Sequence, residues 1–221
     1  MSLQYYPAFI NLDRKECVVV GGGRIAERKT CSLLIAGARV RVISPEITAA
    51  LERKLAGGLI THVKRRYRRG DLAGSFLVVA ATSDEIVNRK VSEDAPCLIN
   101  VVDVPGLSNF ILPSVMRRGP LTIAVSTSGA SPAMAASIRK ELETLYDRDF
   151  ASFTVFLKGL RKKALRKLPD KMAREKFLID SASHSVLKSL RSDGAAKTTE
   201  AVMACFNEAC RLAGKKTGHA R

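Results

Sequence analysis

The chain has 221 residues, 46% of them apolar and 26% charged, a globular composition that excludes a disordered, collagenous or disulfide-scaffold chain. No apolar run reaches the roughly 18 to 20 residues that span a bilayer, and no signal-peptide pattern opens the chain, so we expect a soluble, cytoplasmic protein with no membrane partner. The formal net charge is +16, which points to an anionic partner, either nucleic acid or a polyanionic metabolite.

The first half of the chain alternates strand-like and helix-like segments. Strands are expected at 17–20, 39–43, 59–67, 76–82 and 97–103, with helices at 24–38, 47–55 and 84–93 between them and an added edge strand at 7–12. Because the strands are apolar on both faces, they indicate a parallel sheet covered by helices on both sides. The predicted fold is therefore α/β, with a Rossmann-type sheet.

The pattern changes after Asp103. Three prolines interrupt short segments, one more strand is expected within 119–132, and a helix begins near Ala133. From residue 151 the sequence is helical in pattern and basic, with 16 Lys and Arg against six Asp and Glu. We predict a Rossmann domain at 1–112, a small α+β dimerisation segment at 113–150 and a basic helical C-terminal domain at 151–221.

The segment from Gly21 to Ala26 matches the GxGxxG/A pattern of a dinucleotide-binding turn, with a strand before it and a helix after it. Gly21 permits the tight turn, Gly23 lets the backbone approach a pyrophosphate, and the phosphate lies at the helix N-terminus. The acidic residue expected about 20 positions later is missing, because Ser44 occupies that place. NAD is favoured, although Arg41 nearby leaves a 2′-phosphate possible.

Asp103 follows a strand at the sheet edge where doubly wound folds bind ligands. In this context the sequence resembles the precorrin-2 dehydrogenase family, which includes the N-terminal module of siroheme synthases. The segments that carry the resemblance are VVVGGGRIAERK at 18–29, VISP at 42–45, AATSDEIVN at 80–88, NVVDVPGLSNFILPS at 100–114 and AVSTSGASP at 124–132. Two small departures are Ser83 before Asp84, and Ser128-Gly129-Ala130 before Ser131.

The resemblance implies NAD-dependent oxidation of precorrin-2, a carboxylate-rich tetrapyrrole, to sirohydrochlorin on a homodimer. It makes Asp103 the catalytic residue, acting as a general acid or base. The residues that it places in the cofactor site are Gly21, Gly23, Arg24, Ile25, Ser44, Pro45, Glu46, Thr82 and Val101. Candidates for binding substrate carboxylates are Arg117, Arg118, Arg139 and Lys140.

Several alternatives stay open. Some family members also insert iron into sirohydrochlorin, with Asp103 removing pyrrole protons or meeting the metal, but the cysteines and histidines show no metal-ligand spacing. Ser131 suits either a helix N-cap or a contact with a substrate carboxylate. A nucleotide-sensing regulator with a nucleic-acid-binding tail is the non-enzymatic alternative, although no nucleic-acid-binding motif is found. We expect no methyltransferase module in this protein, and therefore expect another protein to supply precorrin-2.

Overall fold

The structure is a computed structural model that describes residues 5–218 and forms two compact units, Met1–Leu112 and Pro113–Arg221. The end of the Rossmann domain that the sequence analysis placed at 112 stays a prediction. Residues 113–150 and the helical tail belong to one unit, so a separate boundary at 150 stays a prediction. Within the described residues, no helix combines the length and apolarity needed to cross a membrane.

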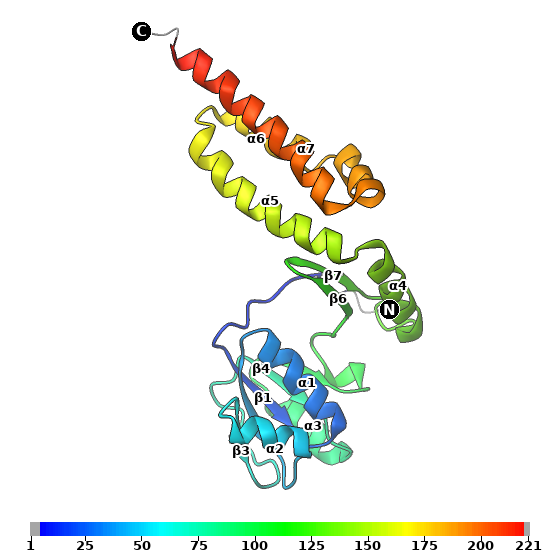
Figure 1. Ribbon diagram of the computed structural model, residues 1–221. Coiled ribbons are helices and arrows are strands. Elements are labelled where there is room, and N and C mark those ends of the chain that lie inside the picture. Colours follow the sequence, from blue (N-terminus) through cyan, green and yellow to red (C-terminus); the bar gives the residue numbers. More distant parts are fainter. Residues whose placement is uncertain (1–4, 219–221) are drawn as a thin grey trace. The chain divides into compact units, whose positions relative to one another are not determined.

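The first unit contains a parallel sheet of five strands in the order β3-β2-β1-β4-β5. Figure 1 labels β1, β3 and β4 of this sheet. The strands are β1 (Glu16–Val20), β2 (Arg39–Ile43), β3 (Ile60–Val63), β4 (Leu77–Ala80) and β5 (Leu98–Val101). The helices are α1 (Arg24–Ile35), α2 (Ala49–Ala56) and α3 (Glu85–Asp94), and the 3-10 turn η1 (Pro105–Leu107) follows β5. The Rossmann-type fold expected from the alternating pattern is confirmed.

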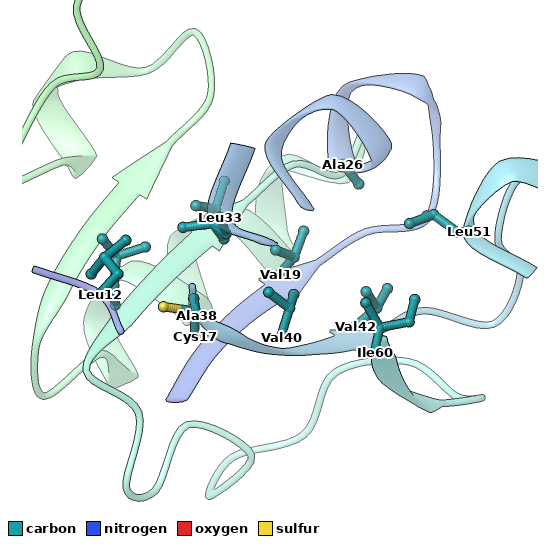
Figure 2. Close-up of a cluster of buried hydrophobic side chains, with 12 residues drawn as sticks. Leu12, Cys17, Val19, Ala26, Leu33, Ala38, Val40, Val42, Leu51 and Ile60 are labelled. Atoms are coloured by element: carbon teal, nitrogen blue, oxygen red, sulfur yellow. The ribbon is translucent and has the colours of Figure 1, made fainter. Parts of the chain in front are cut away.

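Both faces of the sheet are buried, as the apolar strands predict. On one face Cys17 and Val19 of β1 belong to a core with Leu33 of α1, and Figure 2 shows this cluster. On the other face Val18 of β1 belongs to a second core with Val91 of α3. All five side chains are at most 7% exposed. The two cores fix β1 at the centre of the sheet, directly before the glycine turn.

The prediction of an edge strand at 7–12 is wrong. Residues 7–12 form no strand, and β3 and β5 are the two edges of the sheet. Asn11 accepts a hydrogen bond from the amide of Asp13 through its side-chain oxygen (2.9 Å), and the amide of Lys15 bonds to the carbonyl of Leu12 (2.9 Å). These local bonds form a turn in front of β1, and only Leu12 is buried in the core.

The second unit begins with an antiparallel hairpin and continues in helices (Figure 1). Its elements are β6 (Ser114–Arg118), β7 (Leu121–Val125), α4 (Pro132–Leu145), α5 (Arg148–Lys167), α6 (Lys171–Asp180) and α7 (His184–Gly218). The prediction included β7, α4 and the helical tail but missed β6. The Gly119-Pro120 pair between the two strands was the signal in the sequence that could have predicted β6. In the structure Gly119 has φ +56°, a turn conformation that favours glycine.

Helices α5, α6 and α7 bury a core of their own. Its aromatic members are Phe150 and Phe153 of α5, Phe177 of α6 and Phe206 of α7, each at most 7% exposed. Helix α7 is kinked at Gly194, where φ is +80°. The helical tail is thus a packed bundle and not a loose basic extension.

Candidate active site

The first unit has a cleft of about 630 Å³ at the carboxyl ends of its parallel strands. Every strand contributes either its last residues or the loop that follows it. The residues that line it are Val20, Gly21, Gly22, Gly23, Arg24, Ile25, Ile43, Ser44, Pro45, Arg66, Tyr67, Ala81, Thr82, Ser83, Asp84, Val87, Val102 and Asp103. Ligands of doubly wound sheets bind at this edge.

The first two glycines of the turn are required by the fold itself. Gly21 has φ +125°, and a Cβ placed on it would lie 2.3 Å from the carbonyl oxygen of Ala81. A Cβ on Gly22 would lie 1.8 Å from the carbonyl oxygen of Glu46. Contacts below 3 Å cannot be accommodated against backbone, so the loops after β2 and β4 leave no room for side chains here. The sequence analysis did not assign a role to Gly22.

Gly23 differs from both, because no atom lies within 4 Å of the position of a Cβ on it. It is the N-cap of α1 with φ −81°, a conformation open to any residue, and no side chain caps the helix. The first amides of a helix have no intrahelical acceptors and favour an anion. The start of α1 thus has open space beside it, and the assignment of a pyrophosphate to this space stays a prediction.

The loop after β2 contains three residues that the prediction grouped together. Ser44 and Pro45 line the cleft, whereas Glu46 is exposed and lines a different pocket. The hydroxyl of Ser44 donates to the carbonyl of Glu46, and the carbonyl of Ser44 is 2.9 Å from Nε2 of His62. The Ser44 hydroxyl hydrogen is therefore engaged within the loop, and its oxygen retains acceptor capacity.

Arg66 and Tyr67, in the loop after β3, line the cleft and were missed as site residues. The basic run at 64–69 was the available signal, since it follows a strand that ends at the same sheet edge. The hydroxyl of Tyr67 donates to Oδ2 of Asp94 at 2.8 Å. The pKa of the Tyr67 phenol is raised, chiefly because the group is buried and secondly because of this hydrogen bond. The ring of Tyr67 is thus fixed at one wall of the cleft.

A second anchor holds the same loop. Both terminal nitrogens of Arg65 donate to the carboxylate of Asp71 at 2.8 Å, and the guanidinium holds the pKa of that carboxyl below its ordinary value. Arg41 donates to the backbone carbonyl of Asp71 at 3.0 Å and does not line the cleft. Of Arg41 and Arg66, only Arg66 lines the cleft.

After β4, Thr82 lines the cleft within a network of short-range bonds. The buried side chain of Asn88 donates to the carbonyl of Thr82 at 3.0 Å, and its oxygen lies 3.0 Å from the Thr82 hydroxyl. Asp84 caps α3 by accepting from the amide of Val87 at 3.1 Å. The Ala-Thr and Asn residues of the AATSDEIVN segment therefore fix the shape of one wall.

Asp103 follows β5 and lines the cleft. It is exposed and has φ +61°, a left-handed conformation that aspartate tolerates better than most residues. Lys29 on α1 has a lowered pKa, chiefly through burial and then through Arg28, and the charge of Asp103 partly opposes that lowering. Val101, by contrast, is 2% exposed in the core and does not line the cleft.

The remaining candidate residues lie in the second unit. Arg139 forms an ion pair with Glu143, whereas Arg117 and Lys140 are exposed. Ser131 accepts from the amide of Met134 at 3.2 Å, so it serves as the N-cap of α4. Among the residues described, no group of three or more His, Cys, Asp or Glu side chains is placed to hold a metal ion.

Two family models match the chain. Residues 8–114 match a model described as NAD(P)-binding, and residues 118–145 match the model described as "Sirohaem biosynthesis protein central". The first match contains the cleft described above, and the second contains β7 and α4.

Curated relatives carry the name siroheme synthase. The protein of that name from Thioalkalivibrio sulfidiphilus is 37% identical over 204 residues, which are 90% of this chain and 42% of the relative. The one from Methylobacillus flagellatus is 41% identical over 162 residues, or 72% of this chain and 35% of the relative. The chain thus spans about two fifths of the length of these relatives.

A solved structure titled "SirC, precorrin-2 dehydrogenase" is similar over a comparable range. The TM-score is 0.77 and the sequence identity 27%, with 90% of this chain and 100% of that chain covered. The match extends over both units, so it supports the whole architecture and not the Rossmann sheet alone.

Proposed function

Since the chain belongs to the precorrin-2 dehydrogenase family, we propose that it oxidises precorrin-2 to sirohydrochlorin with NAD. One observation carries the proposal most strongly: the glycine turn and Asp103 line the same cleft, although they lie far apart in the sequence. The turn fits a dinucleotide, and Asp103 is a base within the same enclosure. A dehydrogenase needs both at one place.

The chemistry divides between the cofactor and the chain. NAD, when bound, supplies the acceptor for a hydride. The residues of the turn, with the open space at Gly23, bind and orient the dinucleotide, and Ser44, Pro45, Arg66 and Tyr67 form the part of the cleft after β2 and β3. The Asp103 carboxylate takes the proton that the macrocycle releases, so that one hydride and one proton leave together.

The substrate side of the proposal rests on charge. Precorrin-2 carries carboxylates on its periphery, and basic side chains bind such groups through charge-assisted hydrogen bonds. Arg117 and Lys140 are the better candidates of the four predicted, because both are exposed. Arg139 already has a partner in Glu143, and the half-buried Arg118 donates to the carbonyl of Arg117 at 3.1 Å. The net charge of +16 would also attract a polyanionic substrate from a distance.

A homodimer in the cytoplasm belongs to the same proposal. Helix α4 exposes Met134 and Leu145 at 58% and 50%, with Ile138 between them on the helix. Large apolar side chains grouped on one helix are typical of an interface. Ile138→Glu should therefore lower the mass measured by sedimentation equilibrium, whereas Lys140→Glu on the same helix should not. An unchanged mass in the Ile138 variant would exclude this face.

An anaerobic assay tests the proposed function. Mixing the chain with precorrin-2 and NAD should convert the absorption spectrum to that of sirohydrochlorin, with one NADH formed per tetrapyrrole. Parallel reactions with NADP, and with iron or cobalt added after oxidation, report cofactor preference and chelation. No spectral change with either cofactor, together with retention on DNA that falls steeply with salt, would favour the regulator instead.

A further inference from the structure

The outer side of β5 is hydrogen-bonded by the backbone and side chains of a returning loop instead of by a strand. β5 is an edge of the sheet with β4 as its one strand partner. An edge strand presents unpaired N–H and C=O groups along its open side. Here the chain leaves β5, turns through Asp103 and η1, and returns beside the strand at 108–110.

Asn109 bonds to β5 through both its backbone and its carboxamide. Its amide donates to the carbonyl of Ile99 at 3.0 Å, and its side-chain oxygen accepts from the amide of Ile99 at 2.8 Å. Its side-chain nitrogen donates to the carbonyl of Cys97 at 2.9 Å. One residue therefore satisfies three successive groups on the open edge, in place of a neighbouring strand.

Ser108 closes the loop that carries Asp103. Its Oγ accepts from the amide of Val101 at 2.9 Å, and the hydroxyl hydrogen has two acceptors within reach, the carbonyls of Val101 (3.3 Å) and Val104 (3.2 Å). The hydroxyl thus joins the last residue of β5 to the residue directly after Asp103. A further anchor is Ser92 on α3, which donates to the carbonyl of Leu107 at 2.7 Å.

These bonds explain how Asp103 keeps an unfavourable backbone conformation. A non-glycine residue with φ +61° is strained, and such conformations persist where the surrounding structure over-determines them. Neither Ser108 nor Asn109 lines the cleft, whereas Asp103 does. Their bonds therefore hold the loop of Asp103 from outside the cleft lining.

We propose that Ser108 and Asn109 are positioning residues for Asp103: they fix the loop from Val101 to Ser108 so that the carboxylate faces the cleft. The inference rests on the proposed function, in which Asp103 takes the proton. It predicts a defect in the chemical step and none in dinucleotide binding, because the glycine turn is untouched.

A matched pair of variants tests the role of the hydroxyl. Ser108→Thr retains the hydroxyl, and Ser108→Val has nearly the same shape without it. For Ser108→Val we expect kcat to fall by between roughly 10-fold and 100-fold, since small misplacements of a reacting group have effects of this size, with the Kd for NAD unchanged. Ser108→Thr should retain most of the activity. The amide hydrogen exchange of Val101 should become faster in the valine variant alone.

Two further variants separate positioning from general loss of stability. Ser75→Ala removes a buried hydroxyl that donates to the carbonyl of Leu72 at 2.7 Å, away from the cleft lining, and should leave kcat unchanged. Asn109→Asp retains the acceptor for Ile99 and loses the donor to Cys97, so it should lower kcat less than Ser108→Val.

The outcomes distinguish this inference from the proposed function. The positioning role alone would be overturned if the wild type is active, Asp103→Asn is inactive and Ser108→Val has the kcat of the wild type. Equal losses of kcat in Ser75→Ala and Ser108→Val would overturn it as well. A wild type that does not oxidise precorrin-2, or an Asp103→Asn variant with full activity, would overturn the proposed function and the positioning role with it.

Discussion

Gly21 and Ala81 approach each other so closely that a Cβ on Gly21 would lie 2.3 Å from the carbonyl oxygen of Ala81. The contact joins the end of β1 to the end of β4. Gly23, in the same turn, has no atom within 4 Å of its Cβ position. Two glycines of one motif therefore differ: the packing of the fold requires Gly21, whereas Gly23 borders open space.

Gly21→Ala should destabilise the first unit. The methyl group meets backbone and the residue has φ +125°, so we expect a loss of at least about 2 kcal/mol in the free energy of unfolding. Urea denaturation followed by circular dichroism measures it. A midpoint equal to that of the wild type would show that the turn can open without penalty.

Gly23→Ala should leave stability unchanged and weaken NAD binding. Its φ of −81° suits alanine and nothing lies near the new methyl group, so stability should be unchanged. If the open space holds the pyrophosphate, the methyl group should weaken NAD binding by roughly tenfold or more, about 1.4 kcal/mol. Isothermal titration calorimetry checks this. Unchanged affinity would place the phosphates elsewhere.

Arg66 should affect cofactor choice. It lines the cleft, and the end of β2 carries Ser44 where a carboxylate would repel a 2′-phosphate. We expect Arg66→Ala to weaken NADP binding by roughly tenfold and NAD binding by less, because an arginine–phosphate contact is charge-assisted. Lys64→Ala is the control, since Lys64 does not line this cleft. An equal change for both cofactors would argue against a contact with the 2′-phosphate.

The sequence analysis predicted the five sheet strands because each contains apolar, β-branched residues next to expected turns or helices, although those at 39–43 and 59–67 also contain arginines. It predicted a strand at 7–12 that does not form, and it missed β6. At 7–12, apolar residues are present, but the side chain of Asn11 starts a turn. β6 contains two arginines and little apolar sequence, so its strand character depends on pairing with β7.

Positions in the site were predictable where a motif requires a particular residue type, such as glycine in a tight turn. Gly21, Gly23 and Asp103 lie at the sheet edge as the motifs indicate. Side-chain direction after a strand was not predictable, and for this reason Glu46 and Val101 were grouped with the cleft residues although neither lines it. Their assignment to the cofactor site stays a prediction.

The Arg65–Asp71 pair should make stability pH-dependent. The pKa of Asp71 in the folded protein lies below its ordinary value, so the pair's contribution is fully present above about pH 4 and is lost as the pH falls through the folded pKa. Asp71→Asn should therefore lower the urea midpoint at pH 7, and the difference from the wild type should shrink toward pH 3. A difference that is constant with pH would mean that the charge of Asp71 contributes nothing.

The most direct test is anaerobic oxidation of precorrin-2 by NAD with the Asp103→Asn variant. Asparagine tolerates the left-handed conformation and has the shape of aspartate, but it cannot take a proton. We expect oxidation to be abolished while the Kd for NAD, measured by calorimetry, stays within twofold of the wild type. Asp103→Ala should also be inactive, with some added strain. Turnover by Asp103→Asn at the wild-type rate would contradict a cleft in which this carboxylate and the dinucleotide act together.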